Sequence, residues 1–137
     1  MTDARDPIER FLAATAFGVA GASVRRHKFG NKVLRCYLQN GRRAIPINPR
    51  ETIIEGVACV AGVADLPPDV ASLSVITPPS VTERVVEEAI RAGIRNIWMQ
   101  PGAESDRAIE RCLEAGVNVI ADGSCVLVVL GFRERLE

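Results

Sequence analysis

Hydrophobic positions along the chain alternate between two patterns, one typical of helices and one typical of strands. Apolar residues recur at helical spacing in four segments, and the segments between them are short apolar runs. A nearly continuous apolar run is typical of a strand whose two faces are both covered by helices. The strand-like segments are AFGVAG (16–21), AIPINPRE (44–51), LSVITPPS (73–80), NIWMQPG (96–102) and VNVIADGS (117–124).

The helical segments carry start and stop signals. Asp6, Pro7 and Glu9 predict the start of a first helix, with a cap, a proline in the first turn and an acid behind it. Ser80 and Glu83 predict a capping box at the start of a later helix. A glycine follows the last apolar position of the second, third and fourth predicted helices, at Gly41, Gly93 and Gly116.

The repeated order of helix, glycine, strand and turn is the step from which parallel sheets are built. It predicts an α/β, Rossmann-like, doubly wound and mostly parallel sheet of about five strands in a single domain. Only 57–72 departs from this order, and there we expect a short strand at 57–60 followed by one helical turn or a loop. Ligands of such folds bind outside the carboxyl ends of the strands, so we expect a site among the turns that follow them.

Composition narrows the class of protein and of partner. The 137 residues include 17 basic and 17 acidic side chains, a formal net charge of zero, so we expect no nucleic-acid partner. No apolar stretch approaches the roughly 20 residues that span a bilayer, so we expect no membrane partner. One histidine and four widely separated cysteines predict no metal site. They indicate buried free thiols in a reducing, cytoplasmic setting.

The loop at 18–31 is the strongest candidate for a phosphate site. It lacks the G-x-G-x-x-G fingerprint and reads Gly18-x-x-Gly21-x-Ser23 instead. Its glycines let the backbone approach a ligand, and a helix that starts at Gly30 has free N–H groups that favour an anion. Positive charge comes from Arg25, Arg26 and Lys28. A pyrophosphate fits this chemistry, and a solvated basic loop is the alternative.

The segment at 44–51 indicates which nucleotide the domain would carry. An NAD-binding domain usually ends its second strand in an acid that binds the adenosine ribose, but here the strand runs into Asn48, Pro49 and Arg50. Arg50 suits a phosphate on that ribose, which an acid would repel. NADP and coenzyme A both carry such a phosphate, and charge does not separate them.

Six motifs, taken in order, point to a family. They are VAGAS with KFGN, AIPINPRE, ADLPPDV, SVITPPS, IWMQPGAES and VIADGSC. Their order and spacing resemble the small stand-alone CoA-binding proteins, which are similar to the N-terminal domain of the succinyl-CoA ligase alpha subunit. The resemblance covers about residues 8–132. It implies one CoA-binding, Rossmann-like domain with short tails at 1–7 and 133–137.

The resemblance also implies that coenzyme A lies across the strand ends. It assigns phosphate contacts to the first loop, a nucleotide contact to the turn at 48–50, and contacts along the CoA chain and pantetheine arm to 77–79 and 99–101. With Lys28 added on charge, the expected contacts are Gly21, Ala22, Ser23, Val24, Arg25, Lys28, Asn48, Pro49, Arg50, Thr77, Pro78, Pro79, Met99, Gln100 and Pro101.

The pattern predicts no catalytic residue, because His27 has no titratable partner at a recognisable spacing. The chain also ends before the ligase's second domain and its phosphorylated histidine, so ligase activity is not implied. We therefore expect a non-catalytic binding, carrier or regulatory module for coenzyme A or an acyl-CoA.

Two alternatives stay open: an NADP-dependent or acyl-CoA-processing enzyme that acts as a dimer or with a partner, and a scaffold that has lost its ligand. The apolar run at 126–130, with Phe132, either completes the core or forms a homodimer contact. DGSCVLVVLGF departs from the family's usual close, and Cys125 is expected to be a buried thiol.

Overall fold

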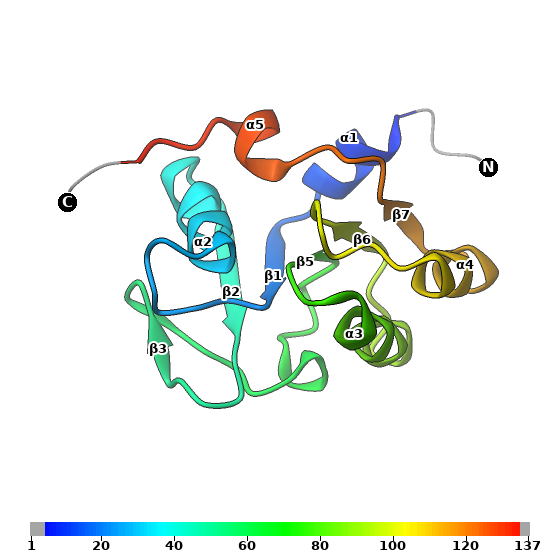
Figure 1. The fold of residues 1–137 in the computed structure, drawn as a ribbon, viewed down its shortest axis with the longest axis horizontal. Coiled ribbons are helices and arrows are strands. Elements are labelled where there is room, and N and C mark those ends of the chain that lie inside the picture. The colour runs from blue at the N-terminus through cyan, green and yellow to red at the C-terminus, as the bar shows by residue number, and fades with distance from the viewer. Residues whose placement is uncertain (1–4, 135–137) are drawn as a thin grey trace.

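The computed structural model describes residues 5–134, whose centre is one parallel sheet (Figure 1). The strand order is β2-β1-β5-β6-β7, and every neighbouring pair is parallel. This confirms the predicted α/β, Rossmann-like architecture of about five strands. The strands are β1 (Ala16–Ala20), β2 (Arg43–Ile47), β5 (Ser72–Val75), β6 (Asn96–Met99) and β7 (Asn118–Ile120).

Helices cover both faces of the sheet, which explains why its strands are apolar on both sides. One face packs against α1, α2 and α5, and the other packs against α3 and α4 (Figure 1). The helices are α1 (Pro7–Leu12), α2 (Phe29–Gln39), α3 (Pro79–Arg91), α4 (Asp106–Glu114) and α5 (Val126–Leu130). No helix among residues 5–134 is long and apolar enough to cross a membrane.

Four of the chain's few aromatic residues pack together under α1 and α2. Phe17 stacks on Tyr37 with ring centroids 4.8 Å apart, and Phe11 meets Trp98 edge-on at 5.3 Å. All four side chains are almost fully buried. The Tyr37 hydroxyl is hydrogen-bonded to the hydroxyl of Ser74 on β5, so the buried polar groups are paired with each other.

Capping residues predicted the starts of two helices, and one of these predictions is confirmed while the other is wrong. Asp6 caps α1 as predicted, because its carboxylate accepts a hydrogen bond from the Glu9 backbone N–H at 2.9 Å and Glu9 closes the box. The capping box predicted at Ser80 is wrong, because α3 begins at Pro79 and its N-cap is Pro78, two residues before the predicted cap. Proline at the first helical position suits the helix, and this moves Ser80 inside it. Glu83 instead accepts a hydrogen bond from the Ser105 hydroxyl at 2.6 Å.

The irregular region between β2 and β5 contains a small hairpin and a single 3-10 turn. The expected strand at 57–60 is only partly formed: the hairpin pairs two short strands, and Val60 makes an isolated bridge to Ile47 of β2. These elements are β3 (Ile53–Ile54), β4 (Val57–Ala58) and η1 (Val63–Asp65). As a result, 60–63 runs beside the carboxyl end of β2.

Strand order reverses at β1, because β2 pairs on one side of it and β5 on the other. The connections therefore leave β1 and β5 toward opposite faces of the sheet, and a crevice opens between their carboxyl ends. This is the part of the fold in which a ligand site is expected.

Candidate ligand-binding site

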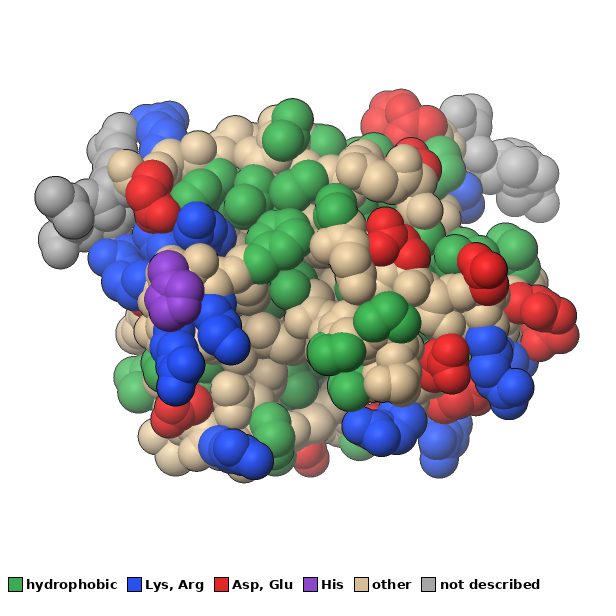
Figure 2. All heavy atoms as spheres, in the orientation of Figure 1, with side chains coloured by type: hydrophobic (Ala, Val, Ile, Leu, Met, Phe, Trp, Pro, Cys, Tyr) green, Lys and Arg blue, Asp and Glu red, His purple; other side chains and the backbone are tan. Residues whose placement is uncertain are grey.

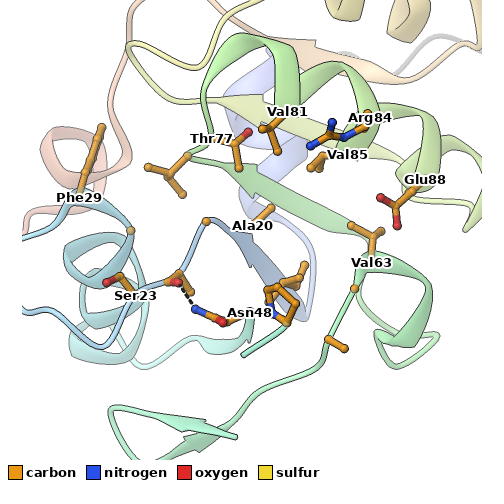
Figure 3. A pocket seen from close by; sticks show the side chains of 18 of the residues that line it. Ala20, Ser23, Phe29, Asn48, Val63, Thr77, Val81, Arg84, Val85 and Glu88 are labelled. Carbon is orange, nitrogen blue, oxygen red and sulfur yellow. Dashed lines mark hydrogen bonds between the residues drawn. The ribbon is translucent and has the colours of Figure 1, made fainter. Parts of the chain in front are cut away.

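A cavity of about 670 Å³ lies at this switch point (Figure 3). That volume is in the range of small-molecule and cofactor sites. Its wall comes from the turn after β1, the start of α2, the end of β2, the segment before η1, the end of β5, and α3. The lining residues are Ala20, Gly21, Ala22, Ser23, Lys28, Phe29, Gly30, Ile47, Asn48, Pro49, Ala61, Gly62, Val63, Ile76, Thr77, Val81, Arg84, Val85 and Glu88.

The turn after β1 is packed so closely that only glycine fits at two positions. Gly21 has φ +95°, and a Cβ on it would lie 2.1 Å from the carbonyl oxygen of Ile76. A Cβ on Gly30 would lie 1.9 Å from the carbonyl oxygen of Gly21. The two glycines therefore let β1, β5 and α2 approach one another, and they bring backbone groups to the cavity wall.

The amino end of α2 faces the cavity without a cap of its own. Its N-cap residue is Lys28, no side chain in the described part of the chain caps it, and its first turn carries no acid. Phe29 and Gly30, the first two helical residues, both line the cavity. Free N–H groups and the helix dipole make such an end favourable for an anion, and the Lys28 ammonium adds positive charge. Figure 2 shows Lys and Arg side chains gathered around the one histidine of the chain, His27, in the loop that leads to α2.

Two asparagine side chains fix the turn, Asn48 from the cavity wall and Asn31 from outside the described lining. The Asn48 amide donates to the carbonyl of Ala22 at 3.0 Å, across the dashed line in Figure 3. The Asn31 amide donates to the carbonyl of Ser23 at 2.8 Å. The Asn48 carbonyl oxygen also accepts from the backbone N–H of Arg50 at 2.8 Å, so one side chain joins the turn after β1 to the turn after β2.

The end of the cavity away from α2 is largely apolar. Ile47, Val63 and Val85 line it, with Arg84 and Glu88 of α3 at its rim (Figure 3). Both charged residues are exposed. The cavity therefore has a polar end made of backbone groups and Lys28, and an apolar slot with charged side chains at its edge. This arrangement suits a ligand with both an anionic group and a flat apolar ring.

The structure brings about half of the expected contacts together. The expected residues that line the cavity are Gly21, Ala22, Ser23, Lys28, Asn48, Pro49 and Thr77. The expected residues outside its described lining are Val24, Arg25, Arg50, Pro78, Pro79, Met99, Gln100 and Pro101.

The residues outside the lining differ in their surroundings. The side chains at 24, 25 and 50 are exposed, as are the two prolines at the start of α3, Pro78 at its N-cap and Pro79 as its first residue. Met99 and Gln100, in contrast, are fully buried at the end of β6. The Gln100 side-chain oxygen accepts from the Val126 backbone N–H at 2.9 Å, which ties β6 to the start of α5.

Sequence reasoning missed the α3 wall and the segment at 61–63. The helical spacing of Val85, Val86, Ala89 and Ile90 indicates only a buried stripe, and Val81 carries no signal of its own. The signal that was available is the pairing of this stripe with Arg84 and Glu88 on the same helix, one residue before Val85 and three residues after it. The segment at 61–63 has no periodic apolar pattern from which its place could be predicted. A single bridge between Val60 and Ile47 brings it to the cavity wall.

The thiols lie away from this cavity, since no cysteine is among its described lining residues. Cys36 and Cys112 are buried as expected, and burial raises the pKa of each to about 11. Cys59 and Cys125 are only half-buried, so the expectation of buried thiols holds for two of the four. Among residues 5–134, no group of three or more His, Cys, Asp or Glu side chains could hold a metal ion.

The apolar run at 126–130, which forms α5, has one buried side and one exposed side. Val126 is fully buried, and Leu127 and Leu130 pack against the same core cluster. Val128 is 81% exposed. The run therefore completes the core with one side and leaves the other side at the surface.

Two solved structures of proteins from Pyrococcus species are similar to this chain over most of its length. A conserved hypothetical protein from Pyrococcus furiosus is 36% identical, with a TM-score of 0.79, over 85% of this chain and 98% of that chain. A hypothetical protein from Pyrococcus horikoshii OT3 is 25% identical, with a TM-score of 0.84, over 93% of this chain and 95% of that chain.

A larger enzyme contains the same fold. A dinucleotide-forming acetyl-coenzyme A synthetase from Ca. Korarchaeum cryptofilum is 23% identical, with a TM-score of 0.69, over 80% of this chain but only 26% of that chain. This likeness concerns the fold alone. The family model described as a CoA binding domain matches residues 15–130. Because that match spans all five strands of the sheet and the whole cavity wall, the chain belongs to the CoA-binding domain family.

Proposed function

We propose that this protein binds coenzyme A, or an acyl-CoA, in the cavity at the switch point and acts as a non-catalytic binding, carrier or regulatory module. The observation that carries the proposal is the open amino end of α2. It lies beside a glycine turn in the cavity of a chain that belongs to the CoA-binding domain family. A reducing, cytoplasmic setting suits the four free thiols and belongs to the same proposal.

The pyrophosphate of the ligand is placed at the polar end of the cavity. There the backbone N–H groups of Phe29 and Gly30 and the Lys28 ammonium supply positive potential, and the turn at 21–23 supplies a close backbone approach. The adenine ring fits the apolar slot formed by Ile47, Val63 and Val85. The pantetheine arm then leaves along the end of β5, past Thr77.

The ribose phosphate is assigned to Arg50. Its side chain is exposed outside the described lining, but its backbone is held by Asn48, whose side chain also holds the turn after β1. An arginine stem can reach several ångströms from such an anchor, and a guanidinium is a strong phosphate partner. If Arg50 binds this phosphate, the affinity for coenzyme A depends on the 3′-phosphate.

Isothermal titration of the full chain with coenzyme A, dephospho-CoA and NADP tests both assignments. We expect coenzyme A to bind more tightly than dephospho-CoA, and Arg50→Gln to remove most of that difference. Arg43→Gln is the matched control, since Arg43 is an exposed arginine at the start of β2, the strand that precedes Arg50, and it pairs with Asp69. Equal affinities for the two coenzymes in the wild-type chain would overturn the role of Arg50.

A second candidate is an NADP-dependent or acyl-CoA-processing enzyme that acts as a dimer or with a partner. The observation that favours it is the exposed side of α5, which could meet a second subunit. Tight NADP binding without coenzyme A binding would favour this candidate over the first. Light scattering on the purified chain would show whether a homodimer forms.

A further inference from the structure

Two buried polar side chains on α2 form a network outside the cavity wall. Asn31 is fully buried and Arg35 is only 4% exposed. The Arg35 Nε donates to the Asn31 side-chain oxygen at 2.6 Å, so the two side chains act as one unit along a single turn of the helix. A buried guanidinium is costly unless its donors find acceptors, and here Nε, Nη1 and Nη2 each find one. The network of the two side chains contacts three other parts of the chain.

The first partner is the loop that leads from β1 to α2. Asn31 donates to the Ser23 carbonyl at 2.8 Å, and Arg35 Nη2 donates to the Arg26 carbonyl at 2.7 Å. These bonds hold the loop near both of its ends, and they hold it by backbone carbonyls. The conformation of residues 21–28, from the glycine turn to Lys28, therefore depends on where Arg35 lies.

The second partner is the β3–β4 hairpin. The Glu55 carboxylate accepts from the Asn31 amide at 3.1 Å and lies 3.4 Å from Arg26 Nε. Glu55 has φ +50°, a left-handed conformation that is uncommon for a residue other than glycine. The tip of the hairpin thus carries an acid held against the same loop.

The third partner is the carboxyl-terminal segment 131–134. The Glu134 carboxylate lies 2.8 Å from Arg35 Nη1 and 3.5 Å from Lys32 Nζ. The Arg35 guanidinium also lies over the Phe132 ring, 5.1 Å from its centroid. The backbone of Arg133 exchanges two hydrogen bonds with the Gln39 side chain, at 2.7 and 2.9 Å.

We propose that Arg35 is a positioning residue that couples the seating of segment 131–134 on α2 to the conformation of the loop at 21–28. The segment is a latch. When it is seated, Glu134 and Phe132 hold the guanidinium in the orientation that binds the Arg26 carbonyl. When it leaves, Arg35 loses an anion and a ring, and the loop loses a fixed anchor. The consequence for ligand affinity rests on the proposed function, but the coupling itself does not.

Hydrogen exchange of the full chain without ligand tests the coupling. Glu134→Gln and Phe132→Ala are the decisive variants, because the two side chains lie at the surface end of the network. We expect either change to accelerate exchange of backbone amides at 22–28 about two- to fivefold, the range of one partly exposed ion pair or cation–π contact. Amides of β6 and α4 should keep their wild-type rates.

Glu114→Gln is the matched control, since Glu114 pairs with Arg111 on α4 at 3.0 Å and its side chain is about as exposed as that of Glu134. It should leave exchange at 22–28 unchanged. Wild-type loop exchange in both latch variants would overturn the coupling. A titration with coenzyme A is run on the same samples, where we expect a similar loss of affinity in the latch variants. A wild-type chain that binds no coenzyme A would overturn the proposed function, and loop exchange would still decide the latch.

Discussion

The helices α2 and α4 both follow the carboxyl ends of sheet strands, β1 and β6, yet their amino ends are built in opposite ways. Ser105 caps α4, with its hydroxyl 3.2 Å from the Ala108 backbone N–H, and Asp106 stands in the first turn. At α2 the N-cap position holds Lys28 and the first turn has no acid. One helix end is satisfied by its own side chains, and the other turns a positive end toward a cavity.

Under the proposed function, the amino end of α2 is the place where this fold gives up stability for binding. A capping side chain stabilises a helix by about 1 kcal/mol, so α2 lacks a contribution that α4 has. Its place is open to an anionic group of the ligand. The buried network of Asn31 and Arg35 lies behind this open end, where it holds the loop that a cap would otherwise have helped to fix.

The largest effect is expected from adding a methyl group at Gly30, the second residue of α2. Gly30→Ala places a methyl group 1.9 Å from the Gly21 carbonyl oxygen, so the loop must move. We expect the free energy of unfolding to fall by about 1–3 kcal/mol and coenzyme A binding to be lost. Gly116→Ala, at the end of α4, is the control: φ there is +73°, but no described atom lies within 4 Å of its Cβ position. It should cost about 1 kcal/mol in stability and leave the affinity for coenzyme A unchanged.

Giving α2 the cap that α4 already has should separate stability from binding. Lys28→Asp puts an acceptor at an N-cap position whose backbone is already extended, at φ −80° and ψ 148°. We expect the ligand-free protein to gain about 0.5–1 kcal/mol of stability and to lose at least about tenfold in affinity for coenzyme A. Thermal melts and isothermal titration on the same preparation give both numbers.

Arg107→Asp makes the same charge change in the first turn of α4, where Arg107 is exposed. It should leave the affinity for coenzyme A at its wild-type value. If this variant weakened binding as much as Lys28→Asp does, the effect would come from net charge and the open end of α2 would have no special role.

Removing the cap of α4 should give the opposite result. Ser105→Ala deletes the bond to the Ala108 backbone N–H and the bond to Glu83. We expect a loss of about 1–2 kcal/mol in the free energy of unfolding, measured by denaturant titration, with no change in the dissociation constant for coenzyme A. Weaker binding in this variant would show that the two helix ends are not independent.

The smallest effect is expected from two ion pairs, Glu134 with Arg35 of α2 and Glu87 with Arg111 of α4. Hydrogen bonds from Arg35 and Arg111 hold the pKa values of Glu134 and Glu87, respectively, below the ordinary glutamate value of 4.5. A lowered pKa in the folded state stabilises the fold above the ordinary value, and that stabilisation is lost as the pH falls through the folded value. Carboxyl carbon NMR should show both glutamates titrating below 4.5, with Lys32 and Arg35 the charges that face Glu134.

The two titrations differ in what they change elsewhere. Amide shifts in the loop at 22–28 should follow the Glu134 titration, whereas the Glu87 titration should change amide shifts only on α3 and α4. Loop shifts that follow neither group would count against the latch.

Much of the fold could be predicted from the sequence, because its signals are local. Apolar runs, terminal glycines and the cap at Asp6 each act over a few residues, and they predicted the order of elements and the parallel sheet. The capping box predicted at Ser80 is wrong for a local reason too: Pro78 and Pro79 start α3 two residues earlier than predicted.

The candidate site could be predicted only in part, because a cavity is assembled from distant segments. The turn at 21–23 and the end of β2 carry glycine, asparagine and proline, which mark them as ligand-facing turns. Arg84 and Glu88 stand on a helix whose pattern indicates only a core face. Arg35 and Glu134, 99 residues apart in the chain, become partners only through the packing of the carboxyl-terminal segment on α2.

A two-dimensional amide NMR titration of the full chain with coenzyme A shows directly whether the ligand binds at the open end of α2. We expect the largest shift changes on the amides of 21–23 and of Phe29 and Gly30. Amides at the capped end of α4, from Asp106 to Ala108, should keep their positions. Largest changes at α4 or along α5, or no change at saturating coenzyme A, would contradict binding at the open end of α2.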